Sequence, residues 1–261
     1  MPKASPLLPR EHGAYAQLAF PLVTGMALAR PTLPTLALAA AGVAFFLANE
    51  SAVVLLGARG GRLKNQEGGR AKVWGSLLLG AGGILGVLGL ATGWPSVWPI
   101  VLLPISAGLL LVPMVWAGLH KTLLGELLVI TAFTTLLLPV AAASGVDPAR
   151  SALAAAVWWL SFSLGTVEVR ALKARHKGKG RIGWTRWVPQ LASVTVVAGA
   201  VYLALGQGGN PKLAGPAAAL LLPALATVVL SFMMVHPKHL KRVGWTLVAV
   251  NTLALVLLLQ G

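Results

Sequence analysis

Two glutamates lie inside stretches of the chain that are otherwise apolar enough to cross a membrane. Glu50 falls within residues 33–57, and Glu168 falls within residues 151–172. An ionisable side chain in hydrocarbon costs several kcal/mol unless it is paired, hydrated or neutral, so such residues commonly mark functional sites. We therefore expect Glu50 and Glu168 to form the polar core of a site, and to be its catalytic residues if the protein is an enzyme.

Basic and amide side chains lie near the same ends of the predicted helices as the two glutamates. Asn49 precedes the first glutamate and Arg59 follows the end of its apolar run, while Arg170 and Lys173 follow the second glutamate. Guanidinium and ammonium groups match the oxygens of phosphates and carboxylates. We predict that these four residues bind the head group of an anionic ligand. Three residues that open other apolar runs complete this predicted set: His12, His120 and Lys121.

Simpler explanations remain open for part of this set. Glu168 is close to a helix end and is able to pair locally with Arg170. His12 has an alternative role in anchoring its helix. The basic residues of segments 59–72 and 173–186 also act as topology signals and attract anionic lipids. Glu50 is deeper, on the order of 10 Å below the end of its helix, so a functional role is better supported there.

The composition is that of a membrane protein. Of the 261 residues, 57% are hydrophobic and 10% are charged, and the mean hydropathy is +0.81. A soluble domain of this length needs far more charge on its surface. The net charge of +15 would also fit a nucleic-acid partner, but the basic residues occur in short segments between apolar runs, which is a topology signal. We therefore expect an all-α polytopic membrane protein that binds no nucleic acid.

The hydropathy pattern predicts nine transmembrane helices, because a spanning helix needs about 20 apolar residues. These helices cover residues 13–30, 33–57, 73–93, 97–117, 122–145, 151–172, 187–206, 213–235 and 243–260. We expect them to form a single transmembrane domain over residues 1–261, arranged as two four-helix halves plus the last helix.

The basic residues predict the orientation of these helices. All but three of the 21 Lys and Arg residues fall on the side of the N-terminus, and the exceptions are Arg30, Arg150 and Lys212. Basic loops stay in the cytoplasm, so the chain is expected to run N-in and C-out through the inner (cytoplasmic) membrane of a cell. The unusual polar residues then lie toward the cytoplasm, which predicts a polar cavity open to that side and lined by the first, second, fifth and sixth helices.

Motifs that identify common enzyme chemistries are absent from the sequence. It contains no Gly-x-Ser-x-Gly elbow, no P-loop and no His-x-x-x-His pair. The absence of cysteine excludes thiolate metal sites and cysteine catalysis. Magnesium needs several oxygen ligands, and two or three separated glutamates are a small set. We therefore predict no metal ligands from the residues themselves and leave the cofactor open.

The opening segment of the chain carries a specific motif. It reads Pro-Arg-Glu-His-Gly-Ala-Tyr-Ala at residues 9–16, and Phe20 and Pro21 follow. This segment resembles the opening of the YwiC-like family of bacterial integral membrane proteins. The family opens with a basic residue, Glu, His, Gly, Ala, an aromatic residue and Ala, with a Pro a few residues later. The resemblance extends over the whole chain in its layout of helices, and it implies no particular reaction.

The architecture also resembles the UbiA-type intramembrane prenyltransferases. These have nine helices in the same orientation, with Asp-rich motifs at the cytoplasmic ends of helices 2 and 6 that hold Mg²⁺-bound isoprenoid diphosphate. Asn49 and Glu50 fall at the first motif, Glu168 falls in the second, and His120 with Lys121 match a basic residue that opens helix 5. The resemblance implies that the two glutamates face each other across one cavity.

The chain departs from the prenyltransferase pattern in its acidic residues. Val53 stands where the first motif has its next Asp, and the second motif keeps a single acid, Glu168, among Arg170, Lys173 and Arg175. The resemblance therefore implies Mg²⁺ as a cofactor but an incomplete set of ligands for it. Arg and Lys are able to take the place of the metal against a diphosphate.

Three functions fit these observations. The first is a divergent prenyltransferase-like protein that binds an isoprenoid, a quinone-like molecule or another anionic amphiphile among the membrane lipids, with catalysis of transfer left open. The second is a proton-coupled small-molecule or ion transporter in which Glu50 or Glu168 takes up the proton. The third is a non-catalytic membrane subunit of a respiratory or assembly complex.

Overall fold

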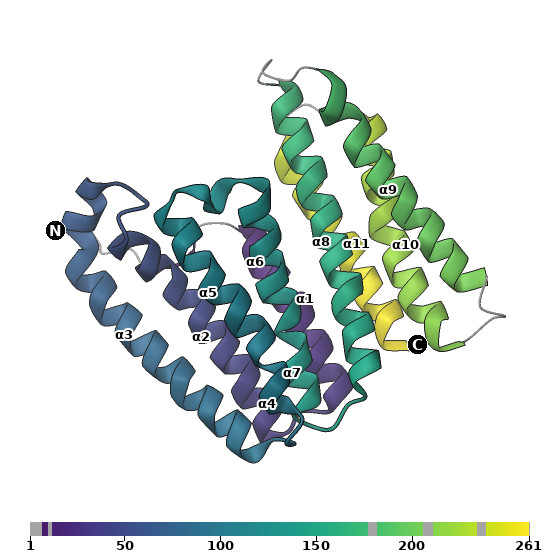
Figure 1. Ribbon diagram of the computed structural model, residues 1–261. Helices are drawn as coiled ribbons and strands as arrows, with labels where there is room; N and C mark the ends of the chain where they lie inside the picture. Colours follow the sequence, from purple (N-terminus) through teal and green to yellow (C-terminus); the bar gives the residue numbers. More distant parts are fainter. Residues whose placement is uncertain (1–6, 10–11, 177–181, 206–210, 234–238, 261) are drawn as a thin grey trace. The chain divides into compact units, whose positions relative to one another are not determined.

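The protein folds into helices that group into two compact units (Figure 1). The computed structural model describes residues 7–9, 12–176, 182–205, 211–233 and 239–260. Unit 1 comprises Met1–Ser151 and unit 2 comprises Ala152–Gly261. Within these described ranges the regular structure is entirely helical. Each unit is described by itself below.

Unit 1 contains α1 through α7. Its elements are α1 (His12–Ala29), α2 (Leu33–Leu55), α3 (Gly61–Thr92), α4 (Val97–Ile100), α5 (Leu102–Trp116), the 3₁₀ turn η1 (Leu119–Lys121), α6 (Leu123–Thr135) and α7 (Leu137–Ala142). The short helix α4 continues into α5 as one apolar stretch, and α6 continues in the same way into α7. Unit 1 ends within the first turn of α8.

Unit 2 is built from four long helices. They are α8 (Pro148–His176), α9 (Ile182–Leu205), α10 (Pro211–Phe232) and α11 (Leu240–Gln260). Neighbouring helices run antiparallel, and α9 and α10 are joined across their interface by a bond between Ser193 Oγ and Thr227 Oγ1 at 2.9 Å (Figure 1). Both side chains are buried, so this bond satisfies polar groups that would otherwise destabilise the interior.

These helices confirm the predicted all-α, polytopic membrane fold. In the described part of the chain, eight helical stretches are long and apolar enough to cross a membrane, and α1 is a shorter apolar helix of 18 residues. Each predicted helix corresponds to one of these nine stretches. The unit boundary differs from the expected two halves, because unit 1 takes the first five predicted helices and unit 2 takes the last four. The single domain and the N-in orientation stay predictions.

One predicted loop is wrong. The basic segment 59–72 was expected to connect two helices, but α3 begins at Gly61 and carries most of this segment on its first three turns. Lys, Arg, Gln and Glu are good helix formers, and Arg70 Nη1 lies 3.6 Å from Glu67 Oε2, one turn apart on the same helix. Hydropathy marked where the apolar part of α3 begins, whereas the helix itself begins 12 residues earlier.

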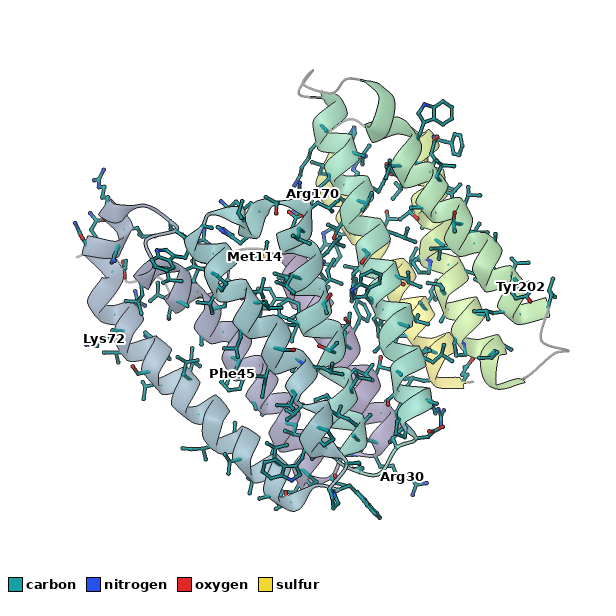
Figure 2. All side chains as sticks on the ribbon, viewed as in Figure 1. Arg30, Phe45, Lys72, Met114, Arg170 and Tyr202 are labelled. Carbon is teal, nitrogen blue, oxygen red and sulfur yellow. The ribbon has the colours of Figure 1, made fainter. Side chains whose placement is uncertain are left out.

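Three glycines of α3 form the seam with α2, and we call them the glycine stripe: Gly75, Gly82 and Gly89. They recur every seven residues, so they lie on one face of the helix. A Cβ added to them would lie 3.1 Å from Ser51 Cβ, 3.0 Å from the Phe45 ring and 2.6 Å from Leu38 Cγ, respectively. Figure 2 shows Phe45 where α2 runs along α3. Small residues allow such close approach in membranes, where no hydrophobic effect drives helices together.

The tryptophans fall into two groups by exposure. Six that lie near helix ends are between 48% and 80% exposed, as in an interfacial belt. They are Trp74, Trp94, Trp98, Trp116, Trp187 and Trp245. Trp158 is fully buried and stacks on Phe162 with ring centroids 5.6 Å apart, so it packs inside unit 2. The side chain of Trp184 lies outside the described residues.

Candidate functional site

A tight turn at the end of α2 positions the first basic residue of the site. The Ala58 N–H donates to the Val53 carbonyl at 3.1 Å, and the Gly57 N–H donates to the Val54 carbonyl at 3.0 Å. This pair of bonds is a Schellman motif, which requires a left-handed residue after the helix. Gly57 supplies that conformation with a φ of 75°, and Gly60 has a φ of 97°. The two glycines reverse the chain, and Arg59 lies between them.

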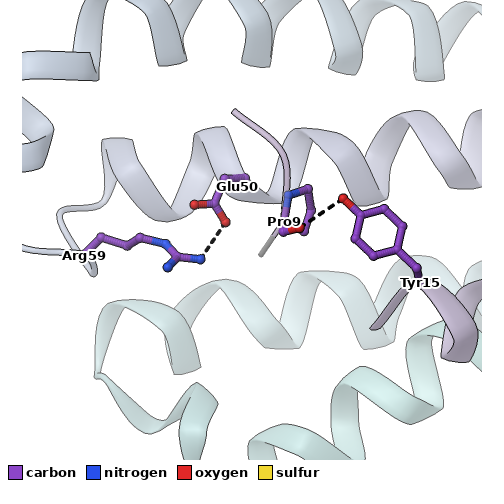
Figure 3. A network of polar contacts seen from close by, with 4 residues as sticks. All are labelled: Pro9, Tyr15, Glu50 and Arg59. Atoms are coloured by element: carbon purple, nitrogen blue, oxygen red, sulfur yellow. Dashed lines mark hydrogen bonds and ion pairs between the residues drawn. The ribbon is translucent and has the colours of Figure 1, made fainter. Parts of the chain in front are cut away.

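The reversal brings Arg59 back against the glutamate of the preceding helix. Arg59 Nη2 donates to Glu50 Oε2 at 2.8 Å, as Figure 3 shows. The Glu50 side chain is 6% exposed, whereas the Arg59 side chain is 31% exposed. A charged partner offsets part of the penalty for burying a carboxylate. The guanidinium thus joins the interior carboxylate to the surface of unit 1, and its planar fork is able to meet a second group there.

Aromatic side chains flank this ion pair on the side of the bundle interior. Phe46 lies one turn before Glu50 on α2, and its ring contacts Tyr15 of α1 and Phe133 of α6 edge to face, with centroids 5.1 and 5.5 Å apart. The Tyr15 hydroxyl donates to the Pro9 carbonyl at 3.0 Å (Figure 3). Pro9 and Tyr15 belong to the opening segment of the chain, so that segment packs one turn from the buried carboxylate.

Asn49 does not share the surroundings of Glu50. Asn49 is exposed and Glu50 is buried, because successive residues of a helix point about 100° apart. Asn49 therefore lies on a different face of α2 from the ion pair.

The predicted basic residues at the start of the fifth helix lie just before it. His120 and Lys121 belong to the 3₁₀ turn η1, and α6 begins at Leu123. Lys121 is exposed and His120 is half-buried, and His120 Nδ1 has no hydrogen-bond partner among the described residues. Gly125 packs directly on the His120 backbone, since an added Cβ would lie 2.6 Å from the His120 carbonyl oxygen. This contact fixes η1 against the first turn of α6.

The remaining predicted residues fall in other surroundings. His12 is the first residue of α1, and its side chain lies outside the described residues. Glu168 lies on α8 of unit 2 and is 1% exposed. Arg170 is half-buried and Lys173 is exposed on the same helix. The structure therefore joins Glu50 to Arg59 within unit 1, while the meeting of Glu50 and Glu168 across one cavity stays a prediction.

The residues around Glu50 do not fit the magnesium site that the prenyltransferase resemblance implies. One carboxylate oxygen of Glu50 already accepts a hydrogen bond from Arg59. Val53, one turn further along α2, is buried and has no oxygen to offer. Among the residues that the structure describes, no group of three or more His, Asp or Glu side chains is placed to hold a metal ion. The donor set favours an anion next to Arg59 over a divalent cation next to Glu50.

The contact between Glu50 and Arg59 was not predicted from the sequence, although both residues were predicted to belong to the site. A signal was present in the local sequence. Gly57 directly after an apolar helix indicates a left-handed cap, and a basic residue two positions later is placed to fold back over the last turns. Residues nine apart were not paired in the sequence analysis because a continuous helix would separate them by about 13 Å.

Comparison with known proteins places the chain in one family. A family model described as YwiC-like protein matches residues 8–142. The match is slightly more than half of the chain, it ends at the last residue of α7, and it contains the opening segment, Glu50 and Arg59. Neither a curated protein nor a solved structure matches the chain.

Proposed function

Because the chain belongs to the YwiC-like protein family, whose matched region contains the Glu50–Arg59 pair, we propose that this region binds an anionic amphiphile at the basic end of unit 1. The ligand class is an isoprenoid or similar lipid with a phosphate-like head group. In this proposal the protein is a divergent relative of the intramembrane prenyltransferases in the inner membrane of a bacterium, and it holds the head group by basic side chains.

The observation that carries the proposal is the difference in burial within the ion pair. Glu50 is enclosed, whereas about a third of the Arg59 side chain reaches the surface. The carboxylate fixes the guanidinium in place, and the exposed N–H groups of the guanidinium remain able to donate to oxygens of a ligand. Fixed guanidinium groups bind phosphates in a bidentate manner, with less loss of side-chain entropy than mobile ones.

The surroundings of Arg59 suit both ends of an amphiphile. Arg62 and Lys64 follow on the first turn of α3 and add positive charge next to it. Apolar side chains that are exposed at the end of α2 and further along α3 offer a surface for an acyl or isoprenoid tail. They include Leu55, Leu56, Val73 and Leu77.

The proposal assigns further head-group contacts to the other basic residues selected from the sequence. His12, His120 and Lys121 are the candidates in the region that the family model matches. Each of these residues is secondary to Arg59, for which an anchoring contact is observed.

The test is the lipid that copurifies with the protein. Wild type, Arg59→Gln and Glu50→Gln are purified in mild detergent, and the bound lipids are extracted and identified by mass spectrometry. We expect an isoprenoid or another phosphate-bearing amphiphile in wild type. Losing one charge-assisted contact lowers its amount about tenfold in Arg59→Gln. Glu50→Gln gives a smaller loss, because the amide still accepts a hydrogen bond from Arg59 but holds the guanidinium less firmly than a carboxylate does.

Lys72→Gln is the matched control, since it removes one positive charge from an exposed position further along α3. An equal loss in Lys72→Gln and Arg59→Gln would reduce the site to general attraction between a basic surface and anionic lipid. Absence of any isoprenoid or quinone, with a lipid content that Glu50→Gln leaves unchanged, would contradict the proposal. Proton-coupled uptake into proteoliposomes that is lost in Glu50→Gln would favour the transporter instead.

A further inference from the structure

Unit 2 contains two interfaces with buried polar side chains, and the two differ in how those side chains are satisfied. At the α9–α10 interface, Ser193 and Thr227 are 1% and 0% exposed and bond to each other directly at 2.9 Å. Thr227 Oγ1 also donates within its own helix. This interface needs nothing further to satisfy its polar atoms.

The second interface lies between α8 and α11, and we call it the α8–α11 seam. Four residues of α8 recur every three or four positions and are all buried: Trp158, Ser161, Gly165 and Glu168. This spacing places them on one face of the helix. A Cβ added at Gly165 would lie 3.4 Å from Leu247 Cδ1, so this face is turned toward α11.

The antiparallel course of the two helices sets the levels along the seam (Figure 1). Ser161 is four residues before Gly165, and Asn251 is four residues after Leu247. In an antiparallel pair these equal steps bring Ser161 and Asn251 to the same level, across the seam from each other. Glu168 lies on the same face of α8, two turns from Ser161 toward the end of α8.

Both polar side chains at this level are buried, and each has a polar atom without a hydrogen-bond partner among the described residues. Ser161 is 3% exposed and Asn251 is 6% exposed. Ser161 Oγ and Asn251 Oδ1 have no hydrogen-bond partner among the described residues. Buried polar atoms in folded proteins are bonded to protein or to ordered water in the great majority of cases, and a carbonyl oxygen left without a donor is destabilising.

We propose that the α8–α11 seam is an internal water-binding site. Water bridges Ser161 Oγ and Asn251 Oδ1 and continues along the seam to the Glu168 carboxyl. A water molecule donates two hydrogen bonds and accepts two, so it satisfies the amide oxygen and the hydroxyl together. Seven residues of helix separate Ser161 from Glu168, so a file of water molecules that joins them would have to extend about 10 Å along the seam.

The file gives Glu168 a hydrogen-bonded route into the bundle, along which a proton is able to move. This role lies in unit 2 and is independent of the amphiphile site of unit 1.

Hydroxyl-radical footprinting tests for this water. Radicals made from water by a short X-ray pulse oxidise side chains next to bound water, even when those side chains are inaccessible from outside. Trp158 is fully buried and lies one turn from Ser161 on the same face, while its neighbour Trp159 is 37% exposed and serves as the internal reference. We expect oxidation of Trp158 in the full-length wild type in nanodiscs, and at least a several-fold reduction in Asn251→Leu.

The matched control is Thr252→Val, at an exposed position whose hydroxyl donates to the Val248 carbonyl in its own helix at 2.9 Å. This variant should leave Trp158 oxidation at the wild-type level. The proposal is overturned if Trp158 is not oxidised in wild type. It is also overturned if Trp158 is oxidised equally in Asn251→Leu and in wild type.

Thermal unfolding supplies a second, independent test. If water satisfies the seam, Asn251→Leu leaves the Ser161 hydroxyl and the water without a partner, and the unfolding midpoint falls by on the order of 5 °C. If the seam is dry, replacing an unbonded amide by an apolar side chain of the same size leaves the midpoint unchanged or raises it. That second result overturns the proposal.

The extension of the water to Glu168 has its own measurement. Asn251→Leu and Glu168→Gln are combined in a double-mutant cycle of unfolding midpoints. Groups this far apart with no shared partner give additive effects, whereas groups joined by one file of water do not. If the double variant is less destabilised than the sum of the two single variants, the result supports a water file that reaches Glu168. If the effects of the two single variants are strictly additive, Glu168 is not part of the site.

Discussion

In the described part of the chain, each unit buries one glutamate, and the two units hold it in different ways. In unit 1, Glu50 on α2 receives an arginine from the turn that follows the helix, at 2.8 Å. In unit 2, Glu168 lies on the face of α8 that carries Ser161 and Gly165 and packs on α11. A buried glutamate of a long apolar helix is thus partnered through local chain geometry in unit 1 and lies along a helix interface in unit 2.

The helix interfaces of the two units also differ, in how closely their helices pack. The α2–α3 seam of unit 1 is closed by the glycine stripe, which leaves no space for even one additional methyl group at Gly89. The α8–α11 seam has ordinary van der Waals spacing at Gly165 and includes two unsatisfied oxygens. Unit 1 is therefore expected to tolerate change at its seam less well than unit 2.

The largest expected effect comes from breaking the ion pair of unit 1. Arg59→Ala leaves the Glu50 carboxylate buried without its charged partner, and removing one partner of a buried pair destabilises by about 2–4 kcal/mol. The measurement is the free energy of unfolding in an SDS titration. The double variant Arg59→Ala with Glu50→Gln should recover part of this loss, because it removes the buried charge. A loss of under about 0.5 kcal/mol, as for an exposed pair, would mean that the carboxylate is satisfied in another way.

The glycine stripe gives the next largest effect. In Gly89→Ala, the new Cβ meets Leu38 Cγ at 2.6 Å and the Pro34 carbonyl oxygen at 3.1 Å, so the Leu38 side chain and the neighbouring backbone of α2 must shift. Overpacking of this kind costs about 1–3 kcal/mol. Gly165→Ala in unit 2 meets a single atom at 3.4 Å and should be close to neutral.

Gly86→Ala is the control within the same helix, because nothing lies within 4 Å of an added Cβ there. It should stabilise α3 slightly, by up to about 1 kcal/mol from helix propensity. Equal losses in Gly86→Ala and Gly89→Ala would remove the distinction between the two faces of α3, and with it the contrast between the seams.

A smaller effect is expected at the turn that aims Arg59. Gly57 has a φ of 75°, and an alanine in that conformation costs about 1–2 kcal/mol. Gly57→Ala should also lower lipid binding if Arg59 is displaced from Glu50. Gly61→Ala is the control four residues later, since Gly61 is within α3 and an added Cβ meets nothing within 4 Å. Binding that is unchanged in Gly57→Ala would show that Arg59 keeps its position without the glycine cap.

The smallest effect is expected at the satisfied pair of unit 2. Ser193→Ala removes the direct bond to Thr227, which retains its donation to the backbone of α10. The loss of one neutral hydrogen bond amounts to about 0.5–1.5 kcal/mol. If Ser193→Ala lowers the free energy of unfolding by much more than Arg59→Ala does, the expected order of effects in the two units is reversed.

Much of the fold could be predicted because the lipid bilayer limits which backbone structures an apolar segment is able to form. Runs of about 20 apolar residues must become helices in a bilayer. In the described part of the chain, eight of the predicted runs form helices long and apolar enough to span, and the first run forms the shorter helix α1. The start of α3 could not be placed in the same way, because hydropathy reports where lipid begins and says nothing of a helix that continues into water. The polar segment 61–72 is helical through the propensity of its Lys, Arg and Gln residues.

The site was predictable in its residue types and less so in its contacts. Glu50 and Arg59 were both selected, since charge inside or next to an apolar run is rare enough to be noticed. Their pairing depends on the left-handed conformations of Gly57 and Gly60, which act over a few residues and leave no periodic pattern. The roles of Asn49 and His120 depend on which face of a helix or turn they occupy, and spacing along one sequence does not determine it.

The length of α3 has a consequence for how unit 1 meets the edge of the bilayer. Its 32 residues extend over about 48 Å, whereas the hydrocarbon core is about 30 Å thick. When its apolar part, from Val73 to Thr92, is aligned with the hydrocarbon, the first 12 residues extend beyond the hydrocarbon as a continuation of the same helix. This helical extension holds four basic residues at fixed heights in the polar layer of the membrane: Arg62, Lys64, Arg70 and Lys72. Lengthening or shortening it by one helical turn would therefore move these charges by about 5 Å relative to lipid phosphates.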